Sequence, residues 1–397
     1  MSLNKYYSHV AFVAILSTLS HAEDYVNIQV MHYSEKEERA TIVSPALELN
    51  IGLGDGYTLN GHLVSDVISG GSPTFYDKRG ASDIISGASP FSNGTRNPSA
   101  YARGHTLSTS DIGFGYVDYR DIRYAGGLFL TKLLHNGNSI GGGVSYSNEH
   151  EYRIPTMSLS YQHLLDTSIE SSLEFDIAYQ NGKKLLWCYN TNGCDGVSGA
   201  SQNAYHQVYN TQVTYNAKFS PDFESSVALF HNSEHGHLSN PYMNVVRNYD
   251  TLPIITNEQR PETRDGYGTQ LSFAKALSQE LTIHGLYRYY QDNWDIHSHT
   301  IETSFLYAYN DKLTSDFGLR YYTQNAANFY SAAFNHFTDE TYASSDWRLG
   351  EYSTFDISLG LSYAFTDNLT NNLELSYYKQ DDDRQAITLF IGQKVRF

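Results

Sequence analysis

The sequence has few of the features that anchor a protein through helices or bind it to nucleic acid. Beyond the first residues, no apolar run approaches the roughly 18 residues of a membrane-spanning helix. Basic residues are scarce: 26 Lys and Arg stand against 43 Asp and Glu, and the formal net charge is -17. No basic face emerges, which argues against a nucleic-acid partner.

Cysteine is also rare, and its two copies lie close together. Cys188 and Cys194 both belong to the segment CYNTNGC. In an oxidising compartment, so close a pair in a Gly/Asn-rich segment indicates a disulfide that staples a loop. A metal site is the weaker interpretation, because no second Cys or His pair lies at zinc-finger spacing. The Gly-rich residues 141–145 do not join a strand to a helix, so they indicate no phosphate loop, and we expect no cofactor.

Aromatic residues, in contrast, are abundant. The chain of 397 residues contains 34 Tyr and 19 Phe, which favour strands and are enriched at membrane interfaces. The mean hydropathy is nevertheless -0.45. A water-soluble β-sandwich could have this composition. So could a transmembrane barrel, because its strands alternate apolar and polar residues and average to a hydrophilic sequence.

Alternation is the main pattern in the chain, and it is clearest in FDISLGLSYAF, residues 355–365. Phe, Ile, Leu, Leu, Tyr and Phe occupy one face there, while Asp, Ser, Gly, Ser and Ala occupy the other. No helical periodicity longer than one or two turns is present after Ala22. In a sandwich the apolar face would cover a core, and in a membrane barrel it would face lipid.

The connections between the alternating segments separate these two folds. Tight turns at 52–56, 135–138, 165–168, 220–222, 277–280, 309–312 and 365–368 alternate with more variable connections. Four of the latter are long: 70–117, 181–204, 234–262 and 324–351. Short periplasmic turns opposite longer external loops are typical of outer-membrane barrels, whereas a sandwich has no reason to keep every second connection short.

The sequence therefore predicts an all-β fold, a transmembrane antiparallel up-and-down barrel of about 16 strands in the bacterial outer membrane. The predicted strands are 25–33, 40–51, 56–69, 118–134, 138–148, 152–165, 168–181, 204–219, 222–234, 263–277, 280–292, 296–309, 312–324, 352–365, 368–380 and 386–397. A barrel of this size leaves an aqueous lumen unless loops fill it.

Both ends of the chain support export to that membrane. Residues 1–22 contain one Lys, an apolar core and small residues at Ser20 and Ala22, as a cleaved signal peptide does; a buried N-terminal helix is the alternative. The barrel domain would then span 23–397. The chain ends in LFIGQKVRF, and alternation that closes on Phe397 resembles the C-terminal signature that the barrel assembly machinery recognises. We expect that machinery and outer-membrane lipid, including lipopolysaccharide, as partners.

Several longer strings resemble the DUF3570 family of uncharacterised bacterial proteins. They are MHYSEKEERATIVSPALELNIGLGDGYTLNGHLVSDVISGGSP, HLSNPYMNVVRN, NEQRPETRDG, YRYYQDNWDIHSHTIE, LRYYTQNAANFY and EYSTFD. The resemblance covers most of the chain after residue 22. It implies an outer-membrane barrel and no assigned biochemical role.

Two strands place charged and aromatic side chains on the face opposite their apolar residues. If the apolar faces meet lipid, the inward set comprises His284, Arg288, Tyr290, Asp316, Arg320 and Tyr322. Two Arg on neighbouring strands, with Asp316 and Asp292 nearby, could form a charged ladder. Such a ladder could line a channel and sort ions, brace the wall through ion pairs, or meet a plug formed by a loop.

The string NEQRPETRDGYG is expected at the external rim. Its Arg260 and Arg264 could bind an anionic ligand or a lipopolysaccharide phosphate through their guanidinium forks. Salt bridges within the loop are the alternative, because three carboxylates lie in the same string.

Histidine clusters give weak candidates for a metal. His235 and His237 flank a strand end, and His297 and His299 share one face of a strand, where two His could converge on zinc or copper. Hydrated His at a barrel rim is the simpler interpretation. Ser233 beside His231 or His235 is the obvious pair for a barrel hydrolase, yet adjacency in sequence makes no dyad, and we expect no enzyme.

The function that follows is a porin-like channel for small solutes or ions. The alternative is a non-conducting structural or docking barrel for a periplasmic or surface partner, and a barrel hydrolase ranks behind both. The sequence names no solute and indicates no oligomeric state.

Overall fold

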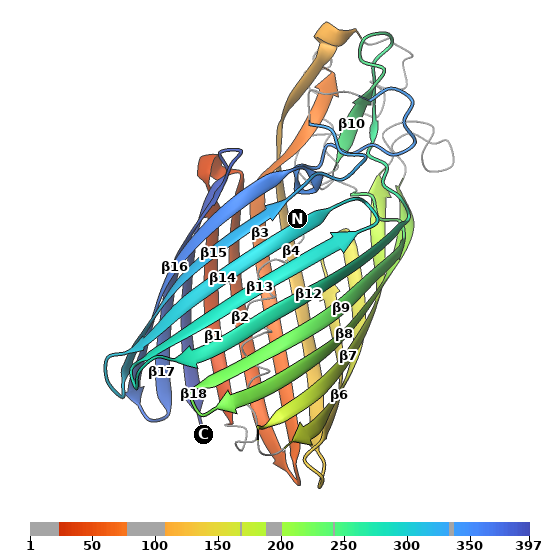
Figure 1. Ribbon diagram of the computed structural model, residues 1–397. Helices are drawn as coiled ribbons and strands as arrows, with labels where there is room; N and C mark the ends of the chain where they lie inside the picture. The colour runs from red at the N-terminus through yellow and green to blue at the C-terminus, as the bar shows by residue number, and fades with distance from the viewer. Residues whose placement is uncertain (1–23, 78–107, 167–168, 188–200, 241–242, 333–336) are drawn as a thin grey trace.

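Antiparallel strands close into a single barrel in the computed structural model, which describes residues 24–77, 108–166, 169–187, 201–240, 243–332 and 337–397 (Figure 1). Among these residues, sixteen strands form the barrel sheet; neighbours along the chain pair with each other, and β1 closes the circle by pairing with β18. The predicted fold class and the predicted strand number are confirmed.

Eight strands run from the end with the short turns to the end with the long loops, and eight return. The first set is β1 (Tyr25–Glu35), β3 (Tyr57–Asp77), β5 (Ser139–Asn148), β7 (Ser171–Trp187), β9 (Phe223–Gly236), β13 (Leu281–Asp292), β15 (Leu313–Gln324) and β17 (Leu369–Gln380). The returning set is β2 (Ala40–Gly54), β4 (Ile112–Leu133), β6 (Tyr152–Asp166), β8 (Ser201–Ser220), β12 (Thr263–Ala276), β14 (His297–Ala308), β16 (Tyr352–Thr366) and β18 (Gln385–Arg396). Single-turn 3-10 helices lie at Lys36–Glu38, Thr109–Asp111 and Trp347–Leu349. None of the helices in the described part of the chain is long and apolar enough to cross a membrane.

A turn at the short-turn end has the backbone conformation that its residues favour. Between β2 and β3 the chain turns through Gly54, Asp55 and Gly56, whose φ angles are 82°, 50° and 75°. Left-handed backbone of this kind favours Gly and tolerates Asp, and it suits the twist of a tight hairpin. The GLGDG segment therefore makes the short turn that was predicted for it.

The long-loop end departs from the prediction. The sequence predicts a long loop at 70–117, between strands that end at residue 69 and begin at 118. Gly70, Gly71 and Pro73 are residues that normally end strands. In the structure β3 and β4 stay paired as far as Asp77 and Ile112, so this hairpin projects beyond its neighbours (Figure 1). Cross-strand hydrogen bonding continues through the glycines.

A small two-stranded sheet that was not predicted lies beside this hairpin. It pairs β10 (Asn244–Arg247) with β11 (Ile254–Asn257) between β9 and β12. The Asn244 side chain accepts a hydrogen bond from the Phe75 amide at 3.0 Å and donates one to the Phe75 carbonyl at 3.1 Å. Phe75, Ile112, Val246 and Ile255 form a common apolar cluster, which joins two loops far apart in sequence.

The outer wall of the barrel is apolar. Leu, Ile, Val and Met side chains at alternate positions are highly exposed, among them Leu63 (63%), Val144 (59%), Leu159 (66%) and Leu229 (61%). Exposed aromatic side chains border this band. Those toward the long loops are Tyr124, Tyr146, Tyr205, Tyr209, Tyr267, Tyr287, Tyr321, Phe355 and Tyr377, and those toward the short turns are Tyr57, Phe219, Tyr307, Tyr309, Phe365 and Phe397. Such a band between aromatic girdles is what lipid contact requires.

Candidate functional site

The inward-facing side chains surround a cavity of about 1410 Å³ inside the barrel. Polar residues dominate the inward positions of β7–β9 and β12–β17, where Ser, Thr, Asn and Gln alternate with charged groups. The ionisable residues that line it include Asp176, Glu224, His284, Arg288, Glu302, Asp316, Arg320, Asp356 and Glu374. A wall of this composition holds water and can contact a hydrophilic solute.

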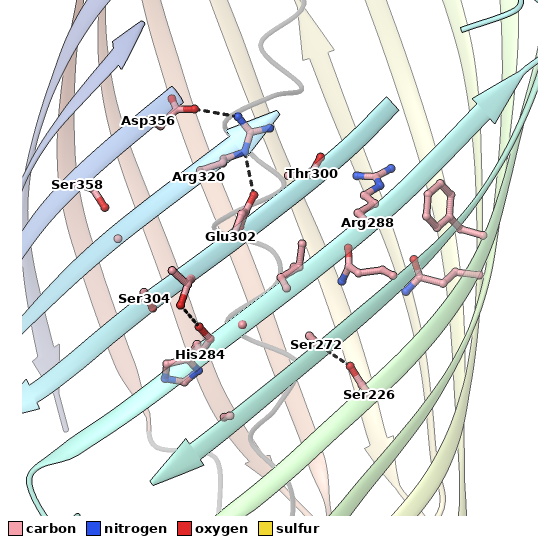
Figure 2. A pocket seen from close by; sticks show the side chains of 18 of the residues that line it. Ser226, Ser272, His284, Arg288, Thr300, Glu302, Ser304, Arg320, Asp356 and Ser358 are labelled. Atoms are coloured by element: carbon pink, nitrogen blue, oxygen red, sulfur yellow. Dashed lines mark hydrogen bonds and ion pairs between the residues drawn. The ribbon is translucent and has the colours of Figure 1, made fainter. Parts of the chain in front are cut away.

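Arg320 forms an ion-pair row across three neighbouring strands. The register places Glu302 of β14 and Asp356 of β16 directly opposite Arg320 of β15. Arg320 Nε donates to Glu302 Oε1 at 2.9 Å, and Nη1 donates to Asp356 Oδ2 at 3.2 Å (Figure 2). All three side chains are partly exposed, and two carboxylates around one guanidinium leave the row with a net negative charge.

Arg288 lies on β13 and is separated from Arg320 by β14 (Figure 2). Its guanidinium stacks over the Phe230 ring, 4.4 Å from the centroid, and it forms no ion pair with any residue that the structure describes. Phe230 can lie there because Gly268 faces it: a Cβ at Gly268 would be 2.1 Å from the Phe230 ring. A glycine on β12 thus makes room for the aromatic ring that supports the cation.

The charged residues that pair along the barrel wall differ from those of the predicted ladder. Arg288 and Arg320 are not on neighbouring strands, and Asp292 pairs with Arg264 at 2.7 Å. Asp316 lines the cavity below Arg320 on the same strand without pairing with it. The actual partners of Arg320, Glu302 and Asp356, could not be chosen beforehand because cross-strand register is not a local property of the sequence.

The remaining lumen candidates lie at different heights along the wall. His284 lies in the half toward the short turns and lines the cavity. Tyr290 also lines it, and its hydroxyl donates to Asp292 at 3.0 Å. Tyr322 is higher on β15 and donates to Gln324, while its ring lies 5.7 Å from the ring of Tyr352.

Three further carboxylates on the barrel wall were not predicted from the sequence. Asp176, Glu224 and Glu374 lie on β7, β9 and β17 and face the same cavity. Each occupies an inward position of an alternating strand, so the periodicity that selected Arg288 and Arg320 could have selected them. The cavity is consequently lined by six carboxylates and two guanidiniums: Asp176, Glu224, Glu302, Asp316, Asp356 and Glu374 against Arg288 and Arg320.

Arg260 belongs to a buried ionic network between the two long loops. Its Nη2 donates to Asp346 Oδ2 at 2.7 Å, and its Nε lies 2.6 Å from Glu258 Oε1. Arg348 Nε donates to Asp346 Oδ1 at 2.8 Å, and the Ser344 hydroxyl donates to Glu258. Burial alone would raise the pKa of Asp346, but Arg348 and then Arg260 hold it well below its usual range.

Arg264 is also held by a carboxylate, and it packs against an aromatic ring. Its Nε donates to Asp292 at 2.8 Å, and its guanidinium packs 4.6 Å from the Trp294 ring centroid. Trp294, Leu238, Phe329 and Leu349 belong to one apolar cluster at the long-loop end. We call the described residues of 237–262 and 325–351, held together by this cluster and by the ionic network, the cap.

The histidine candidates lie in different surroundings. Among the residues that the structure describes, no group of three or more His, Cys, Asp or Glu side chains could hold a metal ion. On the outer wall, His299 Nδ1 bonds the Tyr287 hydroxyl at 2.8 Å and His297 Nδ1 bonds that of Tyr289 at 3.2 Å. His237 belongs to the cap, where burial and then the charges of Lys184 and Arg260 lower its pKa to about 4.

Ser233 also lies on the outer wall, in a polar group near the long-loop end. Its hydroxyl donates to Asp265 Oδ1 at 2.6 Å and lies 2.9 Å from His235 Nε2. In a nucleophilic relay the carboxylate orients the histidine that contacts the serine. Here Asp265 binds the serine directly and lies 3.6 Å from Nε2 of a different histidine, His231. His235 is exposed beside it. The arrangement is a hydrogen-bonded surface group and lacks the order of a catalytic relay.

Two sequence predictions lie outside the described residues. They are the signal peptide at 1–22 and the loop disulfide between Cys188 and Cys194. Both therefore stay predictions.

The sequence matches one protein-family model over nearly its whole length. The model of "Protein of unknown function (DUF3570)" matches residues 8–393. The chain belongs to the DUF3570 family. No curated protein matches it.

Solved structures with a similar fold include outer-membrane proteins. The CymD monoaromatic hydrocarbon channel matches with a TM-score of 0.42 and 11% identity, over 95% of this chain and 89% of that chain. A loop L8 deletion mutant of OmpT, an outer membrane protein of Vibrio cholerae, matches at 0.41 and 11%, over 95% and 99%. A bacterial polysaccharide outer membrane secretin matches at 0.46 and 8%, over 96% and 100%.

The location follows from the barrel itself. A closed sheet whose outer face carries an apolar band between two aromatic girdles is stable only where lipid covers that band. In bacteria, barrels of this type reside in the outer membrane. The DUF3570 chain is therefore an outer-membrane β-barrel, with its short turns in the periplasm and its long loops outside the cell.

Proposed function

We infer that the barrel is a porin-like channel that lets small hydrophilic solutes cross the outer membrane and prefers cations. The observation that carries this proposal is the 1410 Å³ cavity, whose wall carries polar and charged side chains on β7–β9 and β12–β17 and apolar ones such as Met31, Phe129 and Phe390 elsewhere. A 16-stranded barrel is wide enough for an aqueous passage.

The cation preference comes from the charges on the wall. Six carboxylates face the cavity against two guanidiniums, and one guanidinium, Arg320, is shared by Glu302 and Asp356. In a narrow aqueous passage with low-dielectric walls, such an excess attracts cations and repels anions.

Planar-bilayer recording of the purified full-length barrel tests both parts of this proposal. We expect discrete conductance steps, and in a KCl gradient a reversal potential that shows K⁺ crossing faster than Cl⁻. Arg320→Gln should increase the K⁺ preference, because Glu302 and Asp356 lose their shared cation. Lys379→Gln, an exposed change on the outer wall, is the matched control and should leave the reversal potential unchanged.

A non-conducting docking barrel is the second candidate. The cap favours it, because two long loops fold together at the external end through Arg260, Asp346 and an apolar cluster. Persistent silence of a barrel that migrates as folded on a heat-modifiability gel would reject the channel and favour the docking role. Conductance with an anion preference would reject the charge argument alone.

A further inference from the structure

Two positive charges face each other on the outer wall of the barrel at its external end. Arg153 of β6 and Lys183 of β7 are direct cross-strand partners. Both occupy outward positions, since the outward residues of the same strands include Met157, exposed by 65%, and Ile177, exposed by 55%. Arg153 is itself exposed, and Lys183 is partly so.

These two residues are the centre of a continuous cross-strand row. The register runs from Tyr124 to Asn148, then to Arg153, Lys183 and Tyr205. The two tyrosines at its ends are exposed by 59% and 58% and belong to the external aromatic girdle. Tyrosine marks the headgroup level of a membrane, so the two cations lie at that level too.

Below the row on β5 and β6, beyond the outward pair of Tyr146 and Pro155, the outer wall is apolar. Val144 of β5 and Met157 of β6 are opposite each other, four residues from Asn148 and Arg153. Four residues of strand span about 13 Å before the tilt is counted. The cations therefore lie above the acyl chains and within reach of lipid headgroups.

Neither cation has a carboxylate partner among the residues that the structure describes. Glu149 and Glu151 lie in the adjoining turn, yet the side chain of Glu151 is buried and contacts His150 instead. Like charges directly opposite each other on neighbouring strands destabilise a sheet. An anion held between them would turn this repulsion into attraction.

We propose that Arg153 and Lys183 bind a phosphate group of an outer-leaflet lipid of the lipid A type, a phosphorylated, acylated sugar. The guanidinium presents two parallel N–H donors to a phosphate, and the ammonium adds a compact charge. The acyl chains of the same lipid would cover Val144 and Met157, while Tyr124 and Tyr205 border the sugar. This site differs from the Arg260 and Arg264 site considered in the sequence, because Arg260 already pairs with Asp346 inside the cap and Arg264 already pairs with Asp292 of β13.

Native mass spectrometry of the purified full-length barrel tests the proposal. The probes are bisphosphorylated lipid A, the same lipid A without phosphates, and inorganic phosphate. We expect bisphosphorylated lipid A to remain bound to the native protein and to bind at least about tenfold more weakly to Arg153→Gln/Lys183→Gln, since each lost contact is a charge-assisted hydrogen bond. Lys379→Gln, a lone exposed cation on the outer face of β17, should bind like the native protein.

Three results would overturn the proposal. Unchanged lipid A binding by the double variant would overturn the proposal, and so would equal binding of phosphate-free lipid A by the native protein. Competition by inorganic phosphate at the concentration of the lipid would assign the site to free phosphate and also overturn it. The double variant should fold, because it removes a repulsive pair, and gel heat-modifiability checks this. If it fails to fold, the single variants Arg153→Gln and Lys183→Gln carry the same test with smaller expected losses.

Discussion

At the scale of single residues, the alternation of the strands decides whether a side chain meets lipid or water. Leu159 and Ser158 illustrate this, because consecutive residues of β6 lie on opposite faces of one sheet. Leu159 is 66% exposed on the outer wall, and Ser158 lines the cavity. Period 2 is a local property, which explains why His284, Arg288, Asp316 and related positions could be proposed before the fold was known.

The partners of the charged side chains could not be predicted from the sequence in the same way. Asp316 and Asp292 were the expected partners of the two arginines, but Arg320 pairs with Glu302 and Asp356. A shift of register by one residue would exchange the faces, and a shift by two would exchange the partners. Charges therefore meet according to the arrangement of whole strands.

The histidine of the cap predicts a pH dependence. The pKa of His237 is lowered to about 4 in the folded cap, from 6.5, first by burial and then by Lys184 and Arg260. An opened cap therefore binds the proton more readily between about pH 6.5 and pH 4, and the folded cap loses stability as the pH falls through this window. Hydrogen exchange of residues 237–240 should show more opening at pH 5 than at pH 7 after correction for intrinsic rates.

His237→Gln tests that dependence, because it removes the titrating group that belongs to the cap. Its opening should change little between the two pH values, while His163→Gln, an exposed histidine on β6, should behave like the native protein. An equal pH response in all three proteins would show that another group is responsible.

At the scale of elements, each strand has to keep one lipid face and one lumen face through the membrane. Leu159→Arg places a charge within the apolar band and should destabilise the barrel by about 2–4 kcal/mol. Urea unfolding, followed through the heat-modifiable form, measures this loss. Ser158→Arg adds the same side chain on the lumen face and should cost far less. Equal losses would mean that the two faces are not distinct.

The cap is the second element whose stability can be tested. Asp346 is buried and paired with both Arg260 and Arg348. Removing one member of such a network leaves uncompensated charges, so Asp346→Asn should destabilise the closed cap by about 3–5 kcal/mol. Hydrogen exchange across residues 337–351 should then accelerate. Glu351→Gln, an exposed neighbour, should leave exchange unchanged, and unaltered exchange in Asp346→Asn would contradict the role of the network.

At the scale of the whole molecule, closure depends on the two terminal strands. β1 pairs with β18 along its full length, from Tyr25 opposite Arg396 to Glu35 opposite Ala386. The Phe397 amide donates to the Asp24 carbonyl at 3.1 Å, while the Phe397 side chain stays 67% exposed. The backbone completes the seam, and the ring stays on the surface of the barrel.

Phe397→Ala separates these two roles. We expect the yield of folded barrel in the outer membrane to fall severalfold, because the assembly machinery would lose its aromatic signal. Refolding of the purified variant in detergent should match the native protein, since the ring is 67% exposed. Phe365→Ala, another exposed aromatic at the short-turn end, is the control and should keep its membrane yield. An unchanged membrane yield of Phe397→Ala would contradict the signal.

The sequence alone determined the class of fold, the number and order of the barrel strands, and which residues of a strand share a face. These features are local: period 2, turn residues and loop lengths need no knowledge of distant segments. Only the tertiary structure decided which charges pair across the lumen, how residues 237–262 and 325–351 form a cap, and that Arg153 and Lys183 share one row of the outer wall. Those features depend on register and on contacts between distant loops, and both arise only when the barrel closes.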